Sequence, residues 1–258
     1  MLWQIAAKKK LRVEERKMHI PLAALLEQLD HQPVRPFHEA LLLPGISVIA
    51  EVKKASPAKG DFGLKITAAE LAMHYEAGGA RAISVLTEED YFMGSVADLL
   101  AVRSAVTLPV LRKDFVIDSY QLYESRAVGA DAVLLIAGFV QEVELAAMLE
   151  ICEQIGLAAL VETHNEAEIG IALRAGARVV GINNRNLTTF ATDIQQTVKL
   201  AGLIPADVIL VSESGIHTAD DVRLLAAAGA AGVLVGESLV RASNPAEKIR
   251  ELRGESER

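Results

Sequence analysis

A recurring segment constrains the fold more than any other feature of this chain. It reads AGGARAISVLTEED from Ala77, AVGADAVLLIAGF from Ala127, RAGARVVGINNRN from Arg174 and AAGAAGVLVGESL from Ala227. Each copy is typical of a helix end, a Gly-Ala stop, a short β-branched strand and a polar or glycine-containing loop. The anchoring glycines, at positions 79, 129, 176 and 229, lie 47 to 53 residues apart. That spacing is about twice the length of one strand–helix unit, so the repeat predicts strand–helix units in pairs.

A second set of strand-like segments fills the gaps between these copies. Its members are ISVIAEVKK, LPVLRKDF, LAALVETHNE and DVILVSESG. Interleaving the two sets gives eight short strands separated by segments of helix length. Several of the strands are apolar almost throughout, which is typical of parallel strands covered on both faces. Eight such units in 258 residues predict an α/β fold, the (β/α)8 TIM barrel.

The alternative arrangement is a doubly wound open sheet. Its usual dinucleotide signal, a G-x-G-x-x-G after the first strand, is missing from this chain, so the barrel is favoured. Residues 1–45 precede the first strand, and the segments IPLAALLEQLD and HEALLL predict a helical N-terminal extension that packs over one end of the barrel. No Pro-, Gly- or Ser-rich linker separates this extension, so residues 1–258 are expected to form a single domain.

Composition excludes several classes of function. The formal net charge of −8 argues against a nucleic-acid groove and against binding to an anionic membrane surface. No window approaches the ~20 apolar residues of a membrane span. The single cysteine, Cys152, lies in a helical pattern and is expected to be a buried thiol. One thiol builds neither a disulfide framework nor a thiolate metal cluster, and the six histidines show no ligand spacing, so a cytoplasmic protein without a metal is predicted.

Charged residues concentrate at the carboxyl ends of alternate predicted strands. In a (β/α)8 barrel the inward side chains form layers contributed by alternate strands. Here the first, third, fifth and seventh strands end in Glu51 and Lys53, Lys113, Glu162 and Glu213. The even-numbered strands end in uncharged residues, among them Asn183 and Gly236. The pattern predicts a ring of charges that faces one mouth of the barrel.

Two interpretations of this ring are possible, a structural set of ion pairs and a catalytic site. Buried ion pairs stabilise proteins poorly because desolvation can cancel the Coulomb attraction. The carboxyl ends of the strands are where barrel enzymes place their catalytic groups. The functional interpretation is therefore favoured. Lysines and glutamates around one cavity can transfer protons to and from an organic substrate. A lysine at a strand end can also form a Schiff base, as in a class I aldolase, and this alternative stays open.

Two glycine-containing loops predict a phosphate site. SESGI (212–216) follows the seventh strand and VGES (235–238) follows the eighth, where backbone N–H groups of barrel enzymes often converge on a phosphate. Ser56, after the first strand, adds a hydroxyl donor. The acidic segment LTEEDYF after the second strand is expected to face solvent, with Phe92 turned toward the mouth. The predicted partner is a small phosphorylated molecule.

Eight motifs, in order, resemble the indole-3-glycerol phosphate synthase family. They are EVKKASPAKG, LTEEDYFMGS, LPVLRKDFVID, ADAVLLIA, LVETHNEAE, GINNRNL, VSESGI and GVLVGESLVRA, between residues 46 and 242. The resemblance implies a lyase of tryptophan biosynthesis that needs no cofactor. Its reaction is the ring closure of 1-(2-carboxyphenylamino)-1-deoxyribulose 5-phosphate to indole-3-glycerol phosphate, with release of carbon dioxide and water.

The resemblance also implies roles for individual residues. Lys113 is implied as the general acid, Glu162 as a base or cation stabiliser, and Lys53 as the partner of the substrate carboxylate. Residues implied to orient these groups and the sugar hydroxyls are Glu51, Asn183, Glu213, Ser214 and Arg185. Those implied to hold the phosphate are Ser56, Gly215, Gly236 and the backbone at Glu237. Those implied to form the wall for the aromatic ring are Phe92, Phe115, Leu134 and Leu187.

Two positions depart from the family's pattern, and three alternatives accompany the assignment. Ala58 stands where a serine is expected, and Glu237 stands where serine is common. A carboxylate repels a phosphate, so the side chain of Glu237 is expected to point away. The alternatives are a Schiff-base aldolase-like enzyme, a barrel that only binds phosphorylated ligands, and an engineered or reconstructed barrel on this scaffold. A monomer is expected.

Overall fold

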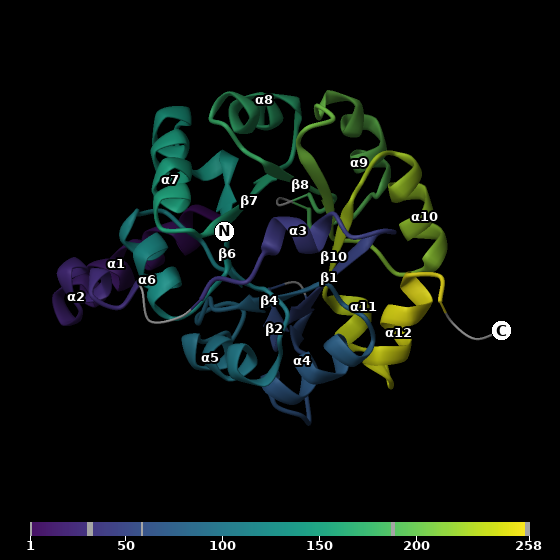
Figure 1. Cartoon of the computed structure of the whole chain (residues 1–258), viewed down its shortest axis with the longest axis horizontal. Helices are drawn as coiled ribbons and strands as arrows, with labels where there is room; N and C mark the ends of the chain where they lie inside the picture. Colours follow the sequence, from purple (N-terminus) through teal and green to yellow (C-terminus); the bar gives the residue numbers. More distant parts are fainter. Residues whose placement is uncertain (1, 30–32, 58, 187–188, 256–258) are drawn as a thin grey trace.

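Eight parallel strands close into a barrel in the computed structural model of the chain (Figure 1). The structure describes residues 2–29, 33–57, 59–186 and 189–255. Each barrel strand pairs in parallel with both of its neighbours in chain order, and the last strand pairs with the first. The barrel strands are β1 (Ser47–Val52), β4 (Ala82–Leu86), β5 (Val110–Lys113), β6 (Ala132–Ile136), β7 (Ala158–Thr163), β8 (Val179–Asn183), β9 (Ile209–Glu213) and β10 (Gly232–Val235). The predicted (β/α)8 fold is confirmed.

Helices surround the barrel and follow its strands. The helices of the outer layer are α4 (Ala68–Ala77), α5 (Val96–Ala105), α6 (Tyr120–Ala127), α7 (Glu142–Gln154), α8 (Glu166–Arg174), α9 (Gln195–Leu200), α10 (Ala219–Ala227), α11 (Glu237–Val240) and α12 (Pro245–Leu252). Short 3-10 turns, η2 (Ala137–Phe139) and η3 (Ala201–Leu203), and a hairpin of β2 (Ala55–Ser56) with β3 (Gly60–Asp61) complete the connections. No helix among the described residues is long and apolar enough to cross a membrane.

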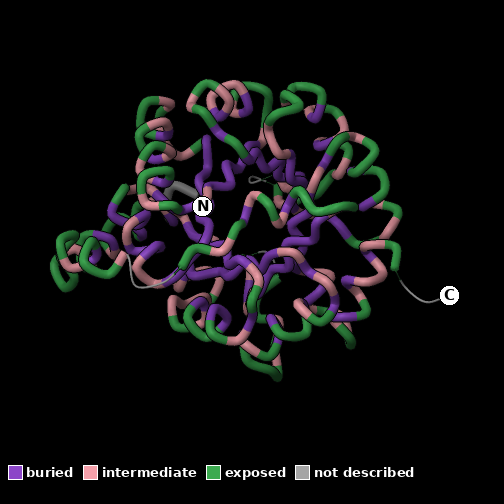
Figure 2. The backbone as a smooth tube through the Cα atoms, viewed as in Figure 1, coloured by how far each residue is buried: buried purple, intermediate pink, exposed green. Residues whose placement is uncertain are grey.

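Side chains alternate between the interior of the barrel and the layer beneath the helices. Residues such as Ile49, Leu160 and Val211 fill the interior, and Val48, Val161 and others pack under the helices. Figure 2 shows the buried strands at the centre and the exposed outer faces of the helices. Because both faces of each strand are covered, the strands are apolar almost throughout, as the sequence pattern predicted.

The glycines of the repeat end helices in the left-handed conformation. Gly79, Gly129, Gly176 and Gly229 have φ angles of 89°, 84°, 93° and 103°. Only glycine adopts this conformation without steric cost, so it ends the helix and turns the chain back toward the next strand. Gly156, with φ of 69°, does the same after α7. The repeat therefore has a structural cause, a glycine cap between each of these helices and the following strand.

The N-terminal extension covers both ends of the barrel, and the expectation of a single end is corrected. Its helices are α1 (Leu2–His19), α2 (Leu22–Leu26) and α3 (Phe37–Leu41). α3 lies across the amino-terminal end of the barrel, where Ser47 donates hydrogen bonds to the carbonyls of Ala40 and Leu41, each at 3.1 Å (Figure 1). α1 lies at the opposite end, where Lys9 contacts Asp114 immediately after β5. α3 buries Phe37 and Leu41 against the apolar interior of the barrel, whereas α1 meets the charged end through the Lys9–Asp114 pair.

Candidate active site

Lys113 stands between two buried carboxylates at the carboxyl ends of the strands. Its Nζ lies 3.2 Å from Glu162 Oε2 and 3.3 Å from Glu213 Oε2. Asn183 on β8 donates a hydrogen bond to Glu162 Oε1 at 3.0 Å. These side chains come from β5, β7, β8 and β9, and each occupies an inward position of its strand. The inward alternation of the strands therefore brings together groups that are up to 100 residues apart in sequence.

The two carboxylates differ in their proton affinity. Burial would raise the pKa of Glu162, but Lys113 and then His164 hold that pKa well below its usual range. Burial raises the pKa of Glu213 to about 7, with Glu162 and Glu51 adding to the effect and Lys113 opposing it. Burial would lower the pKa of Lys113, but Glu213, Glu162 and Glu51 raise it far above its usual value. Lys113 and Glu162 are therefore charged at neutral pH, while Glu213 holds a proton part of the time.

A second lysine–glutamate pair lies at the end of β1, with Glu51 in the strand and Lys53 immediately after it. Lys53 Nζ is 2.8 Å from Glu51 Oε1. Gly236, at the end of β10, leaves the space that this pair occupies, because a Cβ at position 236 would overlap Glu51 Oε1 and lie 3.1 Å from Lys53 Nζ. Lys53 is 14% exposed and Glu51 4% exposed, so the lysine is the more accessible member of the pair.

Aromatic and aliphatic side chains form one wall of the site. The ring of Phe115 lies 6.3 Å from that of Phe92 and 5.6 Å from that of Phe139, measured between centroids. Leu134 of β6 and Ile5 of α1 extend the same wall. A flat apolar ligand can pack here by burying its faces, as aromatic groups do in protein pockets.

The opposite rim is built from the loops after β1, β8, β9 and β10. Ser214 and Gly215 both have positive φ angles, 69° and 76°. Asn184 holds this rim, because its amide donates to Ser212 Oγ at 2.9 Å and to the carbonyl of Ser214 at 3.0 Å. A non-glycine residue with positive φ is uncommon and requires support from its surroundings, which Asn184 supplies.

Cations surround the carboxylate of Glu237 on this rim. Its Oε1 lies 3.6 Å from Lys59 Nζ and 3.2 Å from Arg241 Nε. Burial would raise the pKa of Glu237, but Lys59, Arg241 and Lys53 together lower it. The carboxylate is thus engaged by Lys59 and Arg241.

One cavity of about 470 Å³ contains these groups. The predicted residues that line it are Glu51, Lys53, Ser56, Phe92, Lys113, Phe115, Leu134, Glu162, Asn183, Arg185, Glu213, Ser214, Gly215, Gly236 and Glu237. Leu187 and Ala58, which the sequence also singled out, lie outside the described residues. Arg185 sits at the entrance, where its guanidinium donates to the carbonyl of Phe190 at 3.0 Å.

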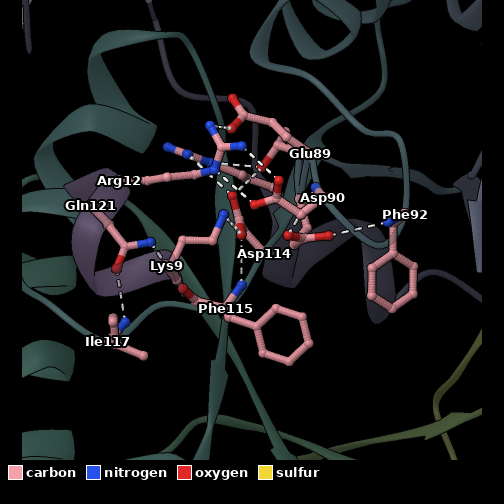
Figure 3. Close-up of polar contacts among 12 residues, drawn as sticks. Lys9, Arg12, Glu89, Asp90, Phe92, Asp114, Phe115, Ile117 and Gln121 are labelled. Atoms are coloured by element: carbon pink, nitrogen blue, oxygen red, sulfur yellow. Dashed lines mark hydrogen bonds and ion pairs between the residues drawn. The ribbon is translucent and has the colours of Figure 1, made fainter. Parts of the chain in front are cut away.

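The acidic segment after β4 does not face solvent as expected. Glu88 is 1% exposed and accepts hydrogen bonds from the backbone N–H groups of Asp90, Tyr91 and Phe92. Arg12 of α1 donates two hydrogen bonds to Asp90, at 2.6 and 2.7 Å (Figure 3). The segment turns inward because basic residues of α1, distant in sequence, neutralise its carboxylates.

A second contact of α1 reaches the segment that carries Lys113. Lys9 Nζ lies 2.6 Å from Asp114 Oδ1, and both side chains are almost completely buried. Asp114 also accepts the backbone N–H of Phe115 at 2.8 Å and the hydroxyl of Thr87 at 2.7 Å (Figure 3). Asp114 also lines the cavity, so this network lies next to the aromatic wall.

Sequence reasoning missed several residues of the site. Phe139 and Ile5 line the cavity, Asn184 supports the rim, and His164 contacts Glu162. Phe139 lies in η2, three residues after the end of β6, and this position close to a strand end was a usable signal. No local pattern marks Ile5, because its place depends on how α1 packs against the barrel.

The protein is a (β/α)8 barrel whose cavity holds lysine and glutamate side chains at the carboxyl ends of the strands, the end where barrel enzymes have their active sites. The sequence pattern of indole-3-glycerol phosphate synthase matches residues 2–252. The chain belongs to the indole-3-glycerol phosphate synthase family.

Related proteins support this membership along nearly the full chain. The indole-3-glycerol phosphate synthase of Carboxydothermus hydrogenoformans is 46% identical over 260 residues, which cover 97% of this chain and 98% of that protein. The synthase of Endomicrobium trichonymphae is 47% identical over 256 residues, covering 98% and 99%. The synthase of Rhodococcus jostii is 50% identical over 213 residues, covering 83% and 79%.

Solved structures of other enzymes share the fold. A 3-hexulose-6-phosphate synthase from Salmonella typhimurium superimposes with a TM-score of 0.66 at 15% identity, covering 81% of this chain and 97% of that one. A thiamine phosphate pyrophosphorylase from Pyrococcus furiosus gives a TM-score of 0.62 at 18% identity, covering 81% and 94%. At this identity the likeness concerns the barrel architecture alone.

Proposed function

We propose that this chain catalyses the reaction of its family, as a carboxy-lyase of tryptophan biosynthesis. It converts 1-(2-carboxyphenylamino)-1-deoxyribulose 5-phosphate to indole-3-glycerol phosphate, carbon dioxide and water. The observation that carries the proposal is the placement of Lys113 Nζ at 3.2 Å from Glu162 and 3.3 Å from Glu213, inside a cavity with one aromatic wall. Closing an aromatic ring onto a carbonyl requires a proton donor at the carbonyl oxygen and an anion near the cationic intermediate.

The cavity supports one orientation of the substrate. Its benzene ring packs on the aromatic wall, and its carboxylate meets Lys53. Its phosphate lies at the opposite rim, near backbone N–H groups of glycine-containing loops and the hydroxyl of Ser56. We assign the phosphate to Ser56, Gly215, Gly236 and the backbone of Glu237, and the sugar hydroxyls to Glu51, Asn183, Ser214 and Arg185.

The chemistry then proceeds in three steps. The ring carbon that bears the carboxylate attacks the ribulose carbonyl carbon, and Lys113 gives a proton to the carbonyl oxygen. The carbon–carboxylate bond breaks, carbon dioxide leaves, and its electron pair restores the aromatic ring. The new hydroxyl then departs as water with a proton from Lys53, while the neighbouring carbon loses a proton to form the indole double bond. Glu162, ionised and 3.2 Å from Lys113, stabilises the cationic intermediate or accepts that proton.

The state of Lys113 disfavours the Schiff-base alternative. A Schiff base forms from a neutral amine, and enzymes that use one lower the pKa of their lysine. Glu213, Glu162 and Glu51 instead raise the pKa of Lys113 against the effect of burial, which keeps the amine protonated and unable to attack a carbonyl. We therefore expect no covalent adduct after borohydride treatment in the presence of the substrate. Trapping of Lys113 would contradict the assignment.

Turnover measurements test the proposed roles directly. Formation of indole-3-glycerol phosphate is followed by fluorescence for wild type, Lys113→Ala and Glu162→Gln. We expect each substitution to lower kcat by more than about a hundredfold, the scale of a lost acid–base group. Lys199→Ala and Glu153→Gln, on exposed parts of the surface, are matched controls. Near-normal rates for both site variants would overturn the roles, and binding of phosphate esters without turnover by wild type would favour a binding protein.

Two further expectations accompany this function. A cytoplasmic location fits a chain with one buried thiol and no disulfide among its described residues. A monomer is also expected. Fractionation and sedimentation would check these two predictions.

A further inference from the structure

His164 lies between two carboxylates at the edge of the active site. Its Nε2 is 3.2 Å from Glu162 Oε1, and its Nδ1 is 3.0 Å from Glu168 Oε2. The backbone N–H of His164 also donates to Glu168 Oε2 at 2.8 Å. His164 directly follows β7, and Glu168 lies in the first turn of α8. The histidine side chain is 14% exposed, so its contacts are largely shielded from solvent.

The groups around His164 favour its protonated form. Glu162 and Glu168 are the charged side chains that face it, from β7 and α8. From α9, the neutral amide of Gln196 donates to the carbonyl of His164 at 2.6 Å. Burial would lower the pKa of His164, but the two carboxylates raise it to about 10. Nδ1 is hydrogen-bonded to Glu168, and Nε2 lies at ion-pair distance from Glu162 without hydrogen-bond geometry, so the positive charge of an imidazolium is next to both carboxylates.

A cation at this position distinguishes the two carboxylates that flank Lys113. Glu162 contacts His164, Lys113 and Asn183, whereas the Glu213 side chain has Lys113 as its cationic neighbour. Glu213 Oε1 is buried and makes no hydrogen bond within the described part of the chain. Glu51 of β1 is the third carboxylate whose charge acts on this group. Two adjacent buried carboxylates do not ionise equally, and the better-solvated one ionises first.

We propose that His164 is a positioning residue that keeps Glu162 ionised beside Lys113. The proton shared by the two carboxylates then resides on Glu213. This inference rests on the proposed role of Glu162, and it adds a residue that sets the charge of the reacting group without touching the substrate. A neutral residue at position 164 raises the affinity of Glu162 for a proton and lets Glu213 ionise more readily.

Nuclear magnetic resonance measures this distribution of protons without turnover. The side-chain carboxyl carbons of Glu162 and Glu213 are titrated in wild type, His164→Asn and Glu168→Gln, and the ring nitrogens of His164 are titrated in wild type. We expect an imidazolium at pH 8 in wild type. In His164→Asn the midpoint of Glu162 rises by at least about one pH unit and that of Glu213 falls, because a cation in contact shifts a carboxylate by about 1 to 3 units. Glu168→Gln keeps the histidine, so the midpoint of Glu162 should again rise and that of Glu213 again fall, by less than in His164→Asn.

Kinetics separate positioning from a purely structural role. The acidic limb of the kcat profile of His164→Asn should move upward by about one pH unit, with KM within about twofold of wild type. His74→Asn, on the exposed face of α4, is the matched control and leaves the profile unchanged. A neutral His164 ring at pH 7, or unchanged carboxyl midpoints in both variants, would overturn the proposal. If Glu162→Gln retained full activity while the midpoints shifted as expected, the proposed role of Glu162 would fail and the charge assignment of His164 would stand.

Discussion

At the scale of single residues, two glycines leave the space that two active-site carboxylates occupy. A Cβ at position 181 would overlap Glu213 Oε1, and a Cβ at position 236 would overlap Glu51 Oε1. Gly181 lies on β8 and Gly236 follows β10, so the even-numbered strands of the barrel make room for the carboxylates of the odd-numbered ones. The family resemblance implied Gly236 in phosphate binding, and the space left by its missing side chain is a second reason for glycine at this position.

Alanine at position 236 therefore tests the packing of the site. Gly236→Ala should displace Glu51 and, with it, Lys53, and should lower kcat/KM by at least about tenfold, because small displacements of oriented groups have large effects on rate. Steady-state kinetics of the purified variant measure the loss. Gly202→Ala is the matched control, since a Cβ there meets no atom within 4 Å. An unchanged kcat/KM for Gly236→Ala would show that the site tolerates the extra methyl group.

At the scale of elements, α1 connects two loops of the active-site mouth. Arg12 holds the loop after β4 through Asp90, and Lys9 holds the segment after β5 through Asp114. The first loop carries Phe92 and the second carries Phe115, and these two rings face each other in the aromatic wall. α1 thus holds the two loops that carry these rings and also contributes Ile5 to the cavity.

The buried pair of Lys9 and Asp114 predicts a measurable cost. Lys9→Met keeps the apolar stem but leaves Asp114 without its nearest cation, and we expect a loss of about 3–5 kcal/mol in the free energy of unfolding. The double variant Lys9→Met/Asp114→Asn should be less destabilised than Lys9→Met, since no unpaired charge stays buried. Chemical denaturation measures all three proteins. Arg174→Met, at an exposed ion pair, is the control and should change little. A wild-type midpoint for Lys9→Met would contradict this account.

At the scale of the whole molecule, the free energy of unfolding should depend on pH in a way that reflects the charges of the active site. The pKa of Glu213 rises from 4.5 to about 7 on folding. Its stabilising contribution to the free energy of unfolding is therefore complete below pH 4.5 and is lost as the pH rises through 7. His164, raised from 6.5 to about 10, contributes fully below pH 6.5 and loses this contribution as the pH rises through 10. Glu162 acts in the opposite sense, because its pKa is lowered and its contribution is lost in acid.

Glu213→Gln isolates one part of this dependence. Glutamine stays neutral, so the free energy of unfolding of wild type minus that of the variant should fall between pH 4.5 and 8, by roughly 1–3 kcal/mol. Urea denaturation at several pH values provides the comparison. A difference that stays constant across this range would mean that Glu213 does not change its pKa on folding.

The sequence predicted the barrel and the ring of charges because both depend on local patterns. A helix end, a glycine such as Gly79 and a short apolar strand follow one another in the chain, and alternation along a strand decides which side chains face inward. Once eight parallel strands close, Lys53, Lys113 and Glu213 must meet at one mouth, whatever the details of the helices.

Only the tertiary structure decided how distant surfaces are paired. Residues 1–45 read as helices, but their sequence did not show that α3 covers one end of the barrel and α1 the other. The loop after β4 was expected to face solvent because it is rich in acidic residues. Arg12, 78 residues away in the chain, neutralises Asp90. Contacts of this kind depend on the docking of helices and the direction of each side chain, and neither is encoded in a local period of the sequence.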